Sequence, residues 1–457
     1  MKNKENLRNI PLTLLTTAIL LLSVLSMNAQ VTKLTLDEAI DLAVKNNYEA
    51  KKARLTVQKA EAQKDEAIGN AFPTIKLNAN YTNNPLKPIF FMPDFKNPGS
   101  NELVPIEVGA TNSFRTAAEL TQILFNSAIF TGIGTAKIAY KVQRERFKSS
   151  IVKTISSVKK SYYGVLLAKE LVDVVDTVLA NARRNLYVTE KMHEEGFIPE
   201  FDLIRARTSV KNVEPELLNA KYNYDRLLNL FKFNLGLNIN DSIELNGEIK
   251  IDKYLSIDID SLTTLLKDAN YDLRSLDYFR QVQRRKIDYY RSDYYPALFL
   301  FGNYIYQGQS NDWNFLTAKS ASVGINLSYT VFQGLKTDNR VQQAKVDYLT
   351  SIEQYNQTYD ALKMQLKNSV EKLEIAQKKL NINKGNIDRA RRGYQIAEIR
   401  YKEGSGSQVE INDANTALAN ANLNYLKAAY DYLEATIELQ ELIGAIPQKY
   451  VNIFDEK

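Results

Sequence analysis

Apolar residues recur at every second position in one stretch of the chain, which predicts a β-strand. From Ala321 to Val331 the odd-numbered residues are Ala, Val, Ile, Leu, Tyr and Val, and the even-numbered ones are Ser, Gly, Asn, Ser and Thr. A period of two over such a stretch is typical of a strand with two different faces. An apolar face opposite a small polar face fits lipid outside and water inside, and a soluble sheet would show the same alternation. Tyrosines near the strand ends favour the membrane interpretation, because their rings suit membrane–water boundaries.

Another stretch repeats its apolar positions in steps of three and four residues, which predicts a helix over 409–444. The same seam occurs in the first half of the chain, over 200–236. Alanine returns at every seventh position among larger apolar residues, and this period indicates coiled-coil packing at close range. The ten seam positions of the second helix are Ile411, Ala414, Leu418, Ala421, Tyr425, Ala428, Tyr432, Ala435, Leu439 and Leu442.

Two proline-free segments, about 127–196 and 335–404, predict helices far longer than those of ordinary globular proteins. About 65 helical residues would reach roughly 100 Å. Gly196 and Gly404 follow these segments and mark the tips of two helical hairpins, because glycine commonly ends a helix. A soluble coiled coil would share the hairpins but would not explain the amphipathic strands. Three glycines could interrupt the first long helix: Gly132, Gly134 and Gly164.

The chain contains two copies of one unit. Residues 182–196 resemble residues 390–404 at an offset of 208, and upstream matches have an offset of 223. A proline-rich insertion at 84–112 explains the change of offset. Because repeats decide a fold, we predict a first structural repeat over 30–250 and a second over 251–457.

Each repeat is predicted to contain a helix, two strands, a long helix and a returning helix. The first helices are expected at about 35–70 and 258–293. Four strands cannot close a barrel, which needs about eight, and lipid does not tolerate open sheet edges. Several copies must therefore share one barrel if the strands lie in a membrane, and three copies would supply twelve strands. The strands are expected at about 73–83, 113–125, 296–307 and 320–333.

The composition of the 457 residues leaves little room for site chemistry. The absence of cysteine excludes disulfides, thiolate metal sites and cysteine nucleophiles. The one histidine, His193, has no partner for a metal cluster and is expected to be a solvated helix-end residue. The net charge of +6 is too mild to indicate a nucleic-acid partner. We therefore assign no catalytic, cofactor or metal site.

Residues 1–29 have the organisation of a secretory signal peptide. Three positive residues precede an apolar run from Ile10 to Leu25, and Ala29 supplies a small residue for cleavage. A transmembrane anchor is the alternative, but the run is shorter than the ~20 residues that span a bilayer. No cysteine follows, so lipidation at a cysteine is excluded. We predict that the chain is exported.

These features resemble the TolC-like outer-membrane efflux protein family. The resemblance covers nearly all of the chain after residue 29, and its most specific element is the repeated order of helix, strands and helical hairpin. The motif Arg400-Tyr401-Lys402-Glu403-Gly404 is similar to the tip of the family's second repeat. The resemblance implies a mainly α protein with a small β part. It implies a homotrimer whose twelve-stranded outer-membrane β-barrel continues into a long periplasmic coiled-coil α-barrel.

The same resemblance implies the partners and the function class. A periplasmic adaptor (membrane fusion) protein, an inner-membrane pump and outer-membrane lipid are the expected partners, and no enzyme activity is expected. The leading hypothesis is the exit duct of a tripartite efflux pump for small molecules. The exit duct of a protein secretion system is an alternative, because the tunnel would be the same. An exported coiled-coil scaffold is a third hypothesis.

The resemblance also assigns residues to a periplasmic gate. In the family, acidic rings on the second return helix line the closed end, and the matching positions here are Glu410 and Asp413. Asp202 matches Glu410 in the first repeat, and Tyr401 matches a tyrosine that helps to hold the closed state. Three carboxylates in a ring would favour cations. Ser407 and Glu410 also form a capping-box pattern, so a structural role for Glu410 stays open.

The two tip glycines, Gly196 and Gly404, are the expected contact points of the adaptor. This chain departs from the family at Gly406, where an arginine is common. That departure puts the family's ion-pair latch at the tip in question.

Overall fold

The computed structural model describes residues 32–94, 99, 101–249, 251 and 258–451. The expected signal peptide at 1–29 lies outside these residues. The described chain divides into two units. The first unit contains the residues up to Arg54, Arg146–Tyr271 and the residues from Tyr359 onward, and the second contains Leu55–Glu145 and Asp272–Thr358.

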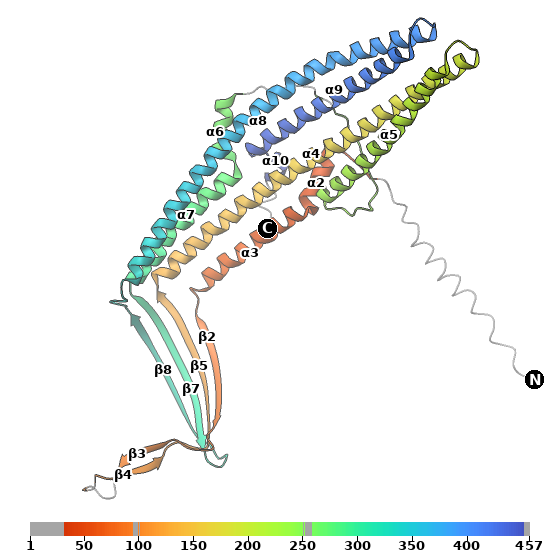
Figure 1. Ribbon diagram of the computed structural model, residues 1–457. Helices are drawn as coiled ribbons and strands as arrows, with labels where there is room; N and C mark the ends of the chain where they lie inside the picture. Colours follow the sequence, from red (N-terminus) through yellow and green to blue (C-terminus); the bar gives the residue numbers. More distant parts are fainter. Residues whose placement is uncertain (1–31, 95–98, 100, 250, 252–257, 452–457) are drawn as a thin grey trace, which may run out of the picture. The chain divides into compact units, whose positions relative to one another are not determined.

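The second unit contains a four-stranded antiparallel sheet in the order β2-β5-β7-β8 (Figure 1). Strand β8 begins and ends earlier than the predicted range 320–333, so Tyr329 and Val331 lie beyond the ladder. Its last pair joins Ser328 to Ala297, and the preceding Pro296 has no N–H with which to extend the ladder. The strands are β2 (Thr74–Asn83), β5 (Asn112–Phe125), β7 (Ala297–Ser310) and β8 (Leu316–Ser328).

The proline-rich insertion, which the sequence presented as a loop, contains a separate two-stranded hairpin. Its strands are β3 (Ile89–Pro93) and β4 (Leu103–Glu107). The hairpin leaves the sheet at the end where β2 and β5 are joined (Figure 1). We call this the loop end of the sheet, and the other end, where the strands join helices, the helix end.

Two long helices have the lengths that the proline-free segments predict. Helix α4 (Ser127–Glu194) has 68 residues and α8 (Lys336–Lys402) has 67. The three glycines of the first segment do not interrupt α4. A glycine inside a helix costs only about 1 kcal/mol, which packing along so long a helix outweighs. The return helices are α5 (Glu200–Leu235) and α9 (Gln408–Leu442).

In the first unit, α8 and α9 pack through the predicted seam. Seven of the ten seam residues of α9 are buried and the other three are half-buried. Seam residues Ala428, Tyr432, Ala435 and Leu439 pack in one cluster with α8 residues Leu366, Val370, Leu373, Ala376 and Leu380. Small residues opposite leucines allow the close approach that the seven-residue period predicts.

The first helix of each repeat was predicted as one element, and this is wrong in both repeats. The chain breaks at Asn47 in the first repeat and at Asn270 in the second. The remaining short elements are β1 (Thr32–Leu34) paired in parallel with β6 (Ile243–Leu245), the 3-10 helix Ser292–Tyr294, and α10 (Gln448–Val451). The broken helices are α2 (Leu36–Asn46), α3 (Tyr48–Gly69), α6 (Ile259–Ala269) and α7 (Tyr271–Arg291).

Each break lies where the end of the return helix crosses the chain. The Asn47 side-chain amide donates to the Asn234 carbonyl, and that of Asn270 donates to the Leu442 carbonyl, both at 2.8 Å. Because these carbonyls lie near helix C-termini, the asparagines satisfy groups that have no partner within their own helix. The two crossings repeat the same contact in both copies of the unit.

Among the helices that the structure describes, none combines the length and apolar character needed to cross a membrane.

Candidate functional site

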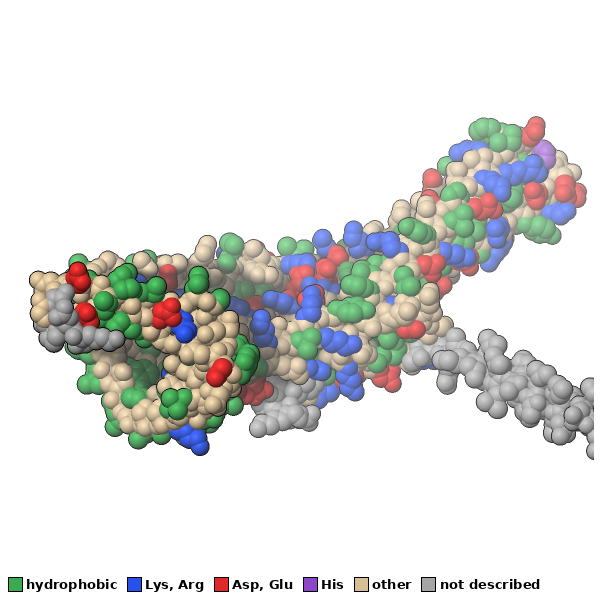
Figure 2. All heavy atoms as spheres, turned by 90° about the horizontal axis from the view of Figure 1, so that it is seen from below, with side chains coloured by type: hydrophobic (Ala, Val, Ile, Leu, Met, Phe, Trp, Pro, Cys, Tyr) green, Lys and Arg blue, Asp and Glu red, His purple; other side chains and the backbone are tan. Residues whose placement is uncertain are grey.

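The two faces of the sheet differ in chemistry, most clearly toward the loop end. In β8, the side chains of Val323, Ile325 and Leu327 are 78%, 64% and 67% exposed. The cross-strand register places these residues on the same face as Ile75 and Leu77 of β2. Figure 2 shows mostly hydrophobic and uncharged side chains over the strands, while charged side chains are dense on the helices. An uncovered apolar face of this kind marks an interaction with another protein or with lipid.

The opposite face is polar toward the loop end. Its polar and charged residues there, taken from the registers, are Lys76, Asn78, Asn80, Thr82, Ser113, Arg115, Glu119, Asn303, Gln307, Gln309, Ser320 and Ser322. The same rows also contain Ala117, Ile305, Leu316 and Ala318. Within the described chain, edge strands β2 and β8 each pair on one side only. Their other sides carry backbone N–H and C=O groups that a further strand can bond.

The long helices α4 and α8 end at the hairpin tips, beside the two glycines that the sequence predicts as helix stops. Gly196 and Gly404 adopt left-handed backbone angles, with φ of 76° and 72°. The Phe197 N–H donates to the Met192 carbonyl at 2.8 Å, and the Ser405 N–H donates to the Arg400 carbonyl at 2.9 Å. These bonds close the last helical turn around each glycine. Neither glycine has a neighbouring atom within 4 Å of where a Cβ would stand, so both are accessible.

His193 is half-buried and closes the first tip rather than standing free in solvent. Its Nδ1 lies 3.1 Å from the Ile198 carbonyl, and a carbonyl only accepts, so Nδ1–H donates. The ring thereby bridges the turn between α4 and α5.

The two acidic positions on α9 are exposed. Glu410 completes the capping box: its backbone N–H donates to Ser407 Oγ at 3.2 Å, and its carboxylate accepts from the Ser407 N–H at 3.3 Å. The same carboxylate pairs with Arg400 at 3.4 Å. Thus Arg400 of α8, rather than the family's arginine at position 406, supplies an ion pair at this tip. Asp413 lies on the exposed surface one turn further along α9.

Tyr401 lies in the interior of the tip region, with only 4% of its surface exposed. Thr189 of α4 donates to the Asn185 carbonyl, so the Tyr401 hydroxyl donates to Thr189 Oγ1, 2.8 Å away. Burial raises the pKa of the Tyr401 phenol, and the nearby charge of Asp202 acts in the same direction. The structure therefore brings Tyr401 and Asp202 into one neighbourhood, joining the second hairpin to the first.

Sequence reasoning missed the partners of Tyr401. Thr189 is fully buried, and Gln408 at the start of α9 is 4% exposed with its side-chain oxygen 3.4 Å from Thr189. Nothing in the pattern of α4 sets Thr189 apart, because single threonines are scattered along that helix. Only the pairing of α4 with α8 makes it a partner.

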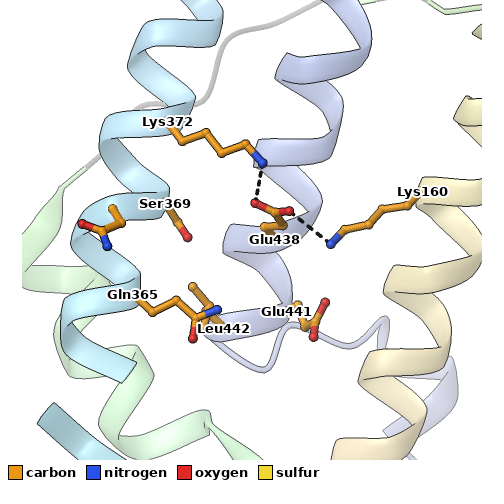
Figure 3. A pocket seen from close by; sticks show the side chains of 8 residues that line it. Lys160, Gln365, Ser369, Lys372, Glu438, Glu441 and Leu442 are labelled. Atoms are coloured by element: carbon orange, nitrogen blue, oxygen red, sulfur yellow. Dashed lines mark hydrogen bonds and ion pairs between the residues drawn. The ribbon is translucent and has the colours of Figure 1, made fainter. Parts of the chain in front are cut away.

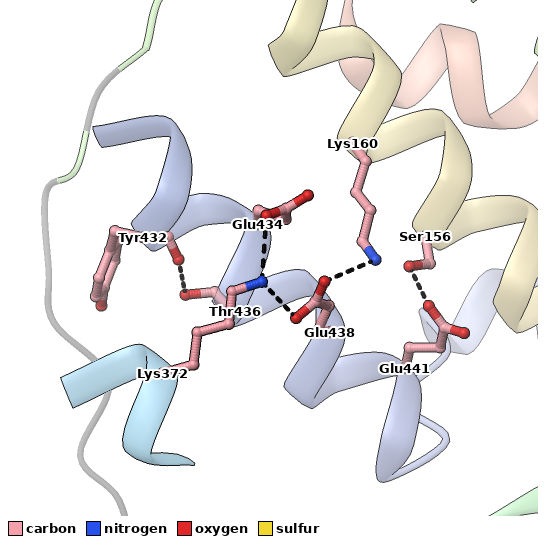
Figure 4. A network of polar contacts seen from close by, with 8 residues as sticks. All are labelled: Ser156, Lys160, Lys372, Tyr432, Glu434, Thr436, Glu438 and Glu441. Carbon is pink, nitrogen blue, oxygen red and sulfur yellow. Dashed lines mark hydrogen bonds and ion pairs between the residues drawn. The ribbon is translucent and has the colours of Figure 1, made fainter. Parts of the chain in front are cut away.

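A cavity of about 300 Å³ opens between α4, α8 and α9 in the first unit (Figure 3). Its charges are paired internally: Lys372 bonds Glu434 at 3.2 Å and Glu438 at 2.9 Å, and Lys160 bonds Glu438 at 3.3 Å. Ser156 of α4 donates to Glu441 of α9 (Figure 4). Each lysine already has a carboxylate, and the third carboxylate, Glu441, accepts from Ser156, so these residues join the three helices and offer no unpaired cation to a ligand.

This network makes stability depend on pH. The pKa of the Glu438 carboxyl lies below its usual value: burial raises it, but the Lys372 hydrogen bond and the Lys160 charge lower it by more. The carboxylate therefore stabilises the fold above the ordinary Glu pKa, and this contribution is lost as the pH falls through the folded-state value. We expect Glu438→Gln to cost about 1 kcal/mol at pH 7 and nothing in acid. Thermal unfolding followed by circular dichroism between pH 7 and pH 3 measures the difference.

The matched control is Glu371→Gln, which removes an exposed carboxylate from α8. This variant is expected to match the parent within about 0.5 kcal/mol at every pH. A cost of Glu438→Gln that did not change with pH would show that packing, not charge, is what Glu438 contributes.

The family described as "Outer membrane efflux protein" matches residues 39–236 and 262–445. The chain belongs to this family. Each of the two matched ranges contains a broken helix, two strands of the four-stranded sheet, a long helix and a return helix, and the first also contains the β3–β4 hairpin.

Named relatives of this efflux protein are similar over most of their length. "Outer membrane protein TolC" of Escherichia coli (strain K12) is 22% identical over 422 residues, which are 88% of this chain and 81% of the relative. "Alkaline protease secretion protein AprF" of Pseudomonas aeruginosa is 22% identical over 345 residues, 74% of this chain and 71% of the relative.

Solved structures share the fold of this efflux protein. The CmeC outer membrane channel of Campylobacter jejuni matches with a TM-score of 0.75 at 18% identity, covering 92% of this chain and 89% of that one. The outer-membrane channel OprN matches with a TM-score of 0.73 at 17% identity, covering 90% of each chain. The predicted fold class, mainly helical with a small β part and a duplicated unit, is thereby confirmed.

Proposed function

We propose that the protein is the exit duct of a tripartite efflux pump in the bacterial outer membrane, passing small molecules from the periplasm or the pump to the exterior. The sheet carries this proposal: its apolar face is uncovered, its other face is polar toward the loop end, and its edge strands have open sides. Lipid on the apolar face and water on the polar face satisfy both surfaces. Membership of the outer membrane efflux protein family supports the same function.

The open edges support a homotrimer. In lipid, unpaired backbone groups at β2 and β8 have no water to bond, so each edge needs a strand from another copy. Three copies of the four-stranded sheet form a twelve-stranded barrel, which is above the minimum that can close around an interior. The long helices then continue as a periplasmic α-barrel.

The helix tips are the proposed contact points of a periplasmic adaptor, which connects the duct to an inner-membrane pump. Gly196 and Gly404 are accessible and reverse the chain at the two tips. The same proposal includes export by the leader at 1–29. It also includes the division of the chain into repeats over 30–250 and 251–457.

The mass of the purified protein in detergent and its conductance in a planar lipid bilayer test this function. We expect a trimer that forms ion-conducting channels. A stable monomer would contradict the shared barrel, and a folded trimer without conductance would contradict the duct in favour of a scaffold.

The proposed periplasmic gate contains Glu410, Asp413, Asp202 and Tyr401. The exposed carboxylate of Asp413 is available to face a water-filled passage, and that of Glu410 is exposed as well but pairs with Arg400 at 3.4 Å. Three copies would form two acidic rings, the Glu410 ring with an arginine beside each carboxylate. The buried contact between Tyr401 and Thr189 supports a closing role, because it ties the second hairpin to the first.

Removing the acidic rings tests the gate. The double variant Glu410→Gln and Asp413→Asn is expected to lower the preference of the channel for cations about twofold in dilute salt. Glutamine also serves in a capping box, so the charge is removed while the start of α9 is kept. Reversal potentials across a KCl gradient measure the preference.

Ser407→Ala is the companion variant, since it removes the cap without changing charge. It should leave ion selectivity as it is. Unchanged selectivity in the double variant would remove Glu410 and Asp413 from the gate.

The exit duct of a protein secretion system is the second candidate, favoured by the similarity to a relative named for alkaline protease secretion. The two functions share one channel and differ in the pump. Co-purification of the adaptor with either a small-molecule pump or a protein exporter separates them.

A further inference from the structure

The polar face of the sheet contains a cavity of about 160 Å³ near its loop end. The registers place Asn80, Arg115 and Gln307 in one row across β2, β5 and β7. The next row toward the loops holds Thr82, Ser113 and Gln309. All six residues line the cavity. Its polar groups are thus one guanidinium, three carboxamides and two hydroxyls, arranged on a single face.

The positive charge of Arg115 is not offset by the described residues around it on this face. Its own row and the rows on either side carry no carboxylate. The nearest acidic position on the face, Glu119, lies four residues away along β5, about 13 Å, and stands directly opposite Lys76. Beyond the strand ends, the loop residue Asp312 accepts hydrogen bonds from Ser310 and the Asn314 backbone. The face therefore has a net positive charge, located at Arg115.

A guanidinium beside carboxamide and hydroxyl donors suits a carboxylate or phosphate. The planar fork of arginine binds such groups through two parallel hydrogen bonds, and side-chain amides and hydroxyls supply further donors around it. An apolar or cationic ligand would gain nothing from this set.

We propose that Arg115, with Asn80, Gln307 and Gln309, forms a binding site for organic anions on the inner wall of the duct. This anion-binding site rests on the proposed function, because three copies place three such sites around one passage. The anion-binding site raises the local concentration of substrates that carry a carboxylate or phosphate. It thereby gives the strand-lined part of the duct a selectivity for anions, whereas the acidic residues of the proposed gate favour cations.

The test compares Arg115→Gln with Arg115→Lys and Lys319→Gln in planar bilayers. Lys319 adjoins Ala318, which belongs to the Arg115 row, but its side chain lies on the apolar face beside the Tyr306 ring. Lys319 therefore carries the same charge at nearly the same level along the strands, but on the opposite face of the sheet. We expect Arg115→Gln to lower the chloride-to-potassium permeability ratio about twofold in 0.1 M salt. Arg115→Lys and Lys319→Gln should both keep the ratio of the parent.

Inorganic phosphate serves as the ligand probe. It should reduce the single-channel current of the parent, and the half-blocking concentration should rise several-fold in Arg115→Gln but not in Lys319→Gln. An unchanged permeability ratio and unchanged phosphate block in conducting Arg115→Gln channels would overturn the proposed anion-binding site. The proposed exit-duct function would still stand. An equal change in Lys319→Gln would also overturn the anion-binding site, since the effect would then come from overall surface charge. Absence of conductance in the folded parent would instead overturn the proposed function.

Discussion

Replacing Gly236 with alanine is expected to destabilise the protein by about 3 kcal/mol or more. Gly236 has a φ of 71°, a conformation that costs a residue with a Cβ about 1–2 kcal/mol. A Cβ there would also stand 2.3 Å from the carbonyl oxygen of Asn46 and 2.6 Å from its carbon. These are backbone atoms at the crossing of α5 with the α2–α3 break, so the clash requires the two helices to separate. Chemical denaturation followed by circular dichroism measures the loss.

The second repeat supplies an internal replicate. Gly444 has a φ of 66°, and its Cβ would stand 2.5 Å from the Ala269 carbonyl oxygen, so Gly444→Ala should cost a similar amount. Gly393→Ala is the control, because this α8 glycine has open space around it and should become slightly more stable in a helix. If Gly236→Ala were no less stable than Gly393→Ala, the crossing would not be a fixed point of the fold.

Placing an arginine at Val323 is expected to prevent stable assembly in the membrane. Val323 lies in the middle of β8 on the apolar face and is 78% exposed. A charged side chain on the lipid face near the bilayer midplane costs about 2–4 kcal/mol in each strand that carries it. In a trimer the substitution occurs three times in one barrel. The yield of trimer extracted from lipid vesicles, followed on gels without heating, measures assembly.

Ser322→Arg is the matched control, since this neighbour points to the polar face opposite Asn303. Water on that face should accept the charge, and Ser322→Arg should assemble almost as well as the parent. Equal loss of trimer in both variants would contradict the assignment of lipid and water to the two faces.

The sequence predicted those elements whose cause is local. The alternation around Val323 follows from two environments on either side of one strand, and the seam around Ala428 follows from a single helical contact. Both patterns are written into consecutive residues. The stop at Gly404 is local for the same reason, because a left-handed residue ends a helix wherever it stands.

The features that the sequence did not reveal depend on distant partners. At the break, the Asn47 side-chain amide donates to a carbonyl 187 residues further along the chain, while its Oδ1 accepts from the Glu49 and Ala50 N–H groups at the start of α3. The local sequence contains neither glycine nor proline there. Strand β8 ends at Ser328, opposite Ala297, and the residue before Ala297 is Pro296, which has no N–H for a further ladder bond. The partner of Tyr401 lies 212 residues away. The first two contacts lie within one repeat and the third joins the two repeats, so each becomes visible only when distant parts of the chain are folded together.

The buried contact between Tyr401 and Thr189 has a consequence for the proposed gate. The phenol is the donor in this bond, and burial raises its pKa, so it holds its proton at neutral and acidic pH. Acid cannot break the bond, because neither hydroxyl gains a charge as the pH falls. In the proposed gate, parting the two hairpins would therefore break a bond between two neutral hydroxyls, which a fall in pH does not weaken by itself.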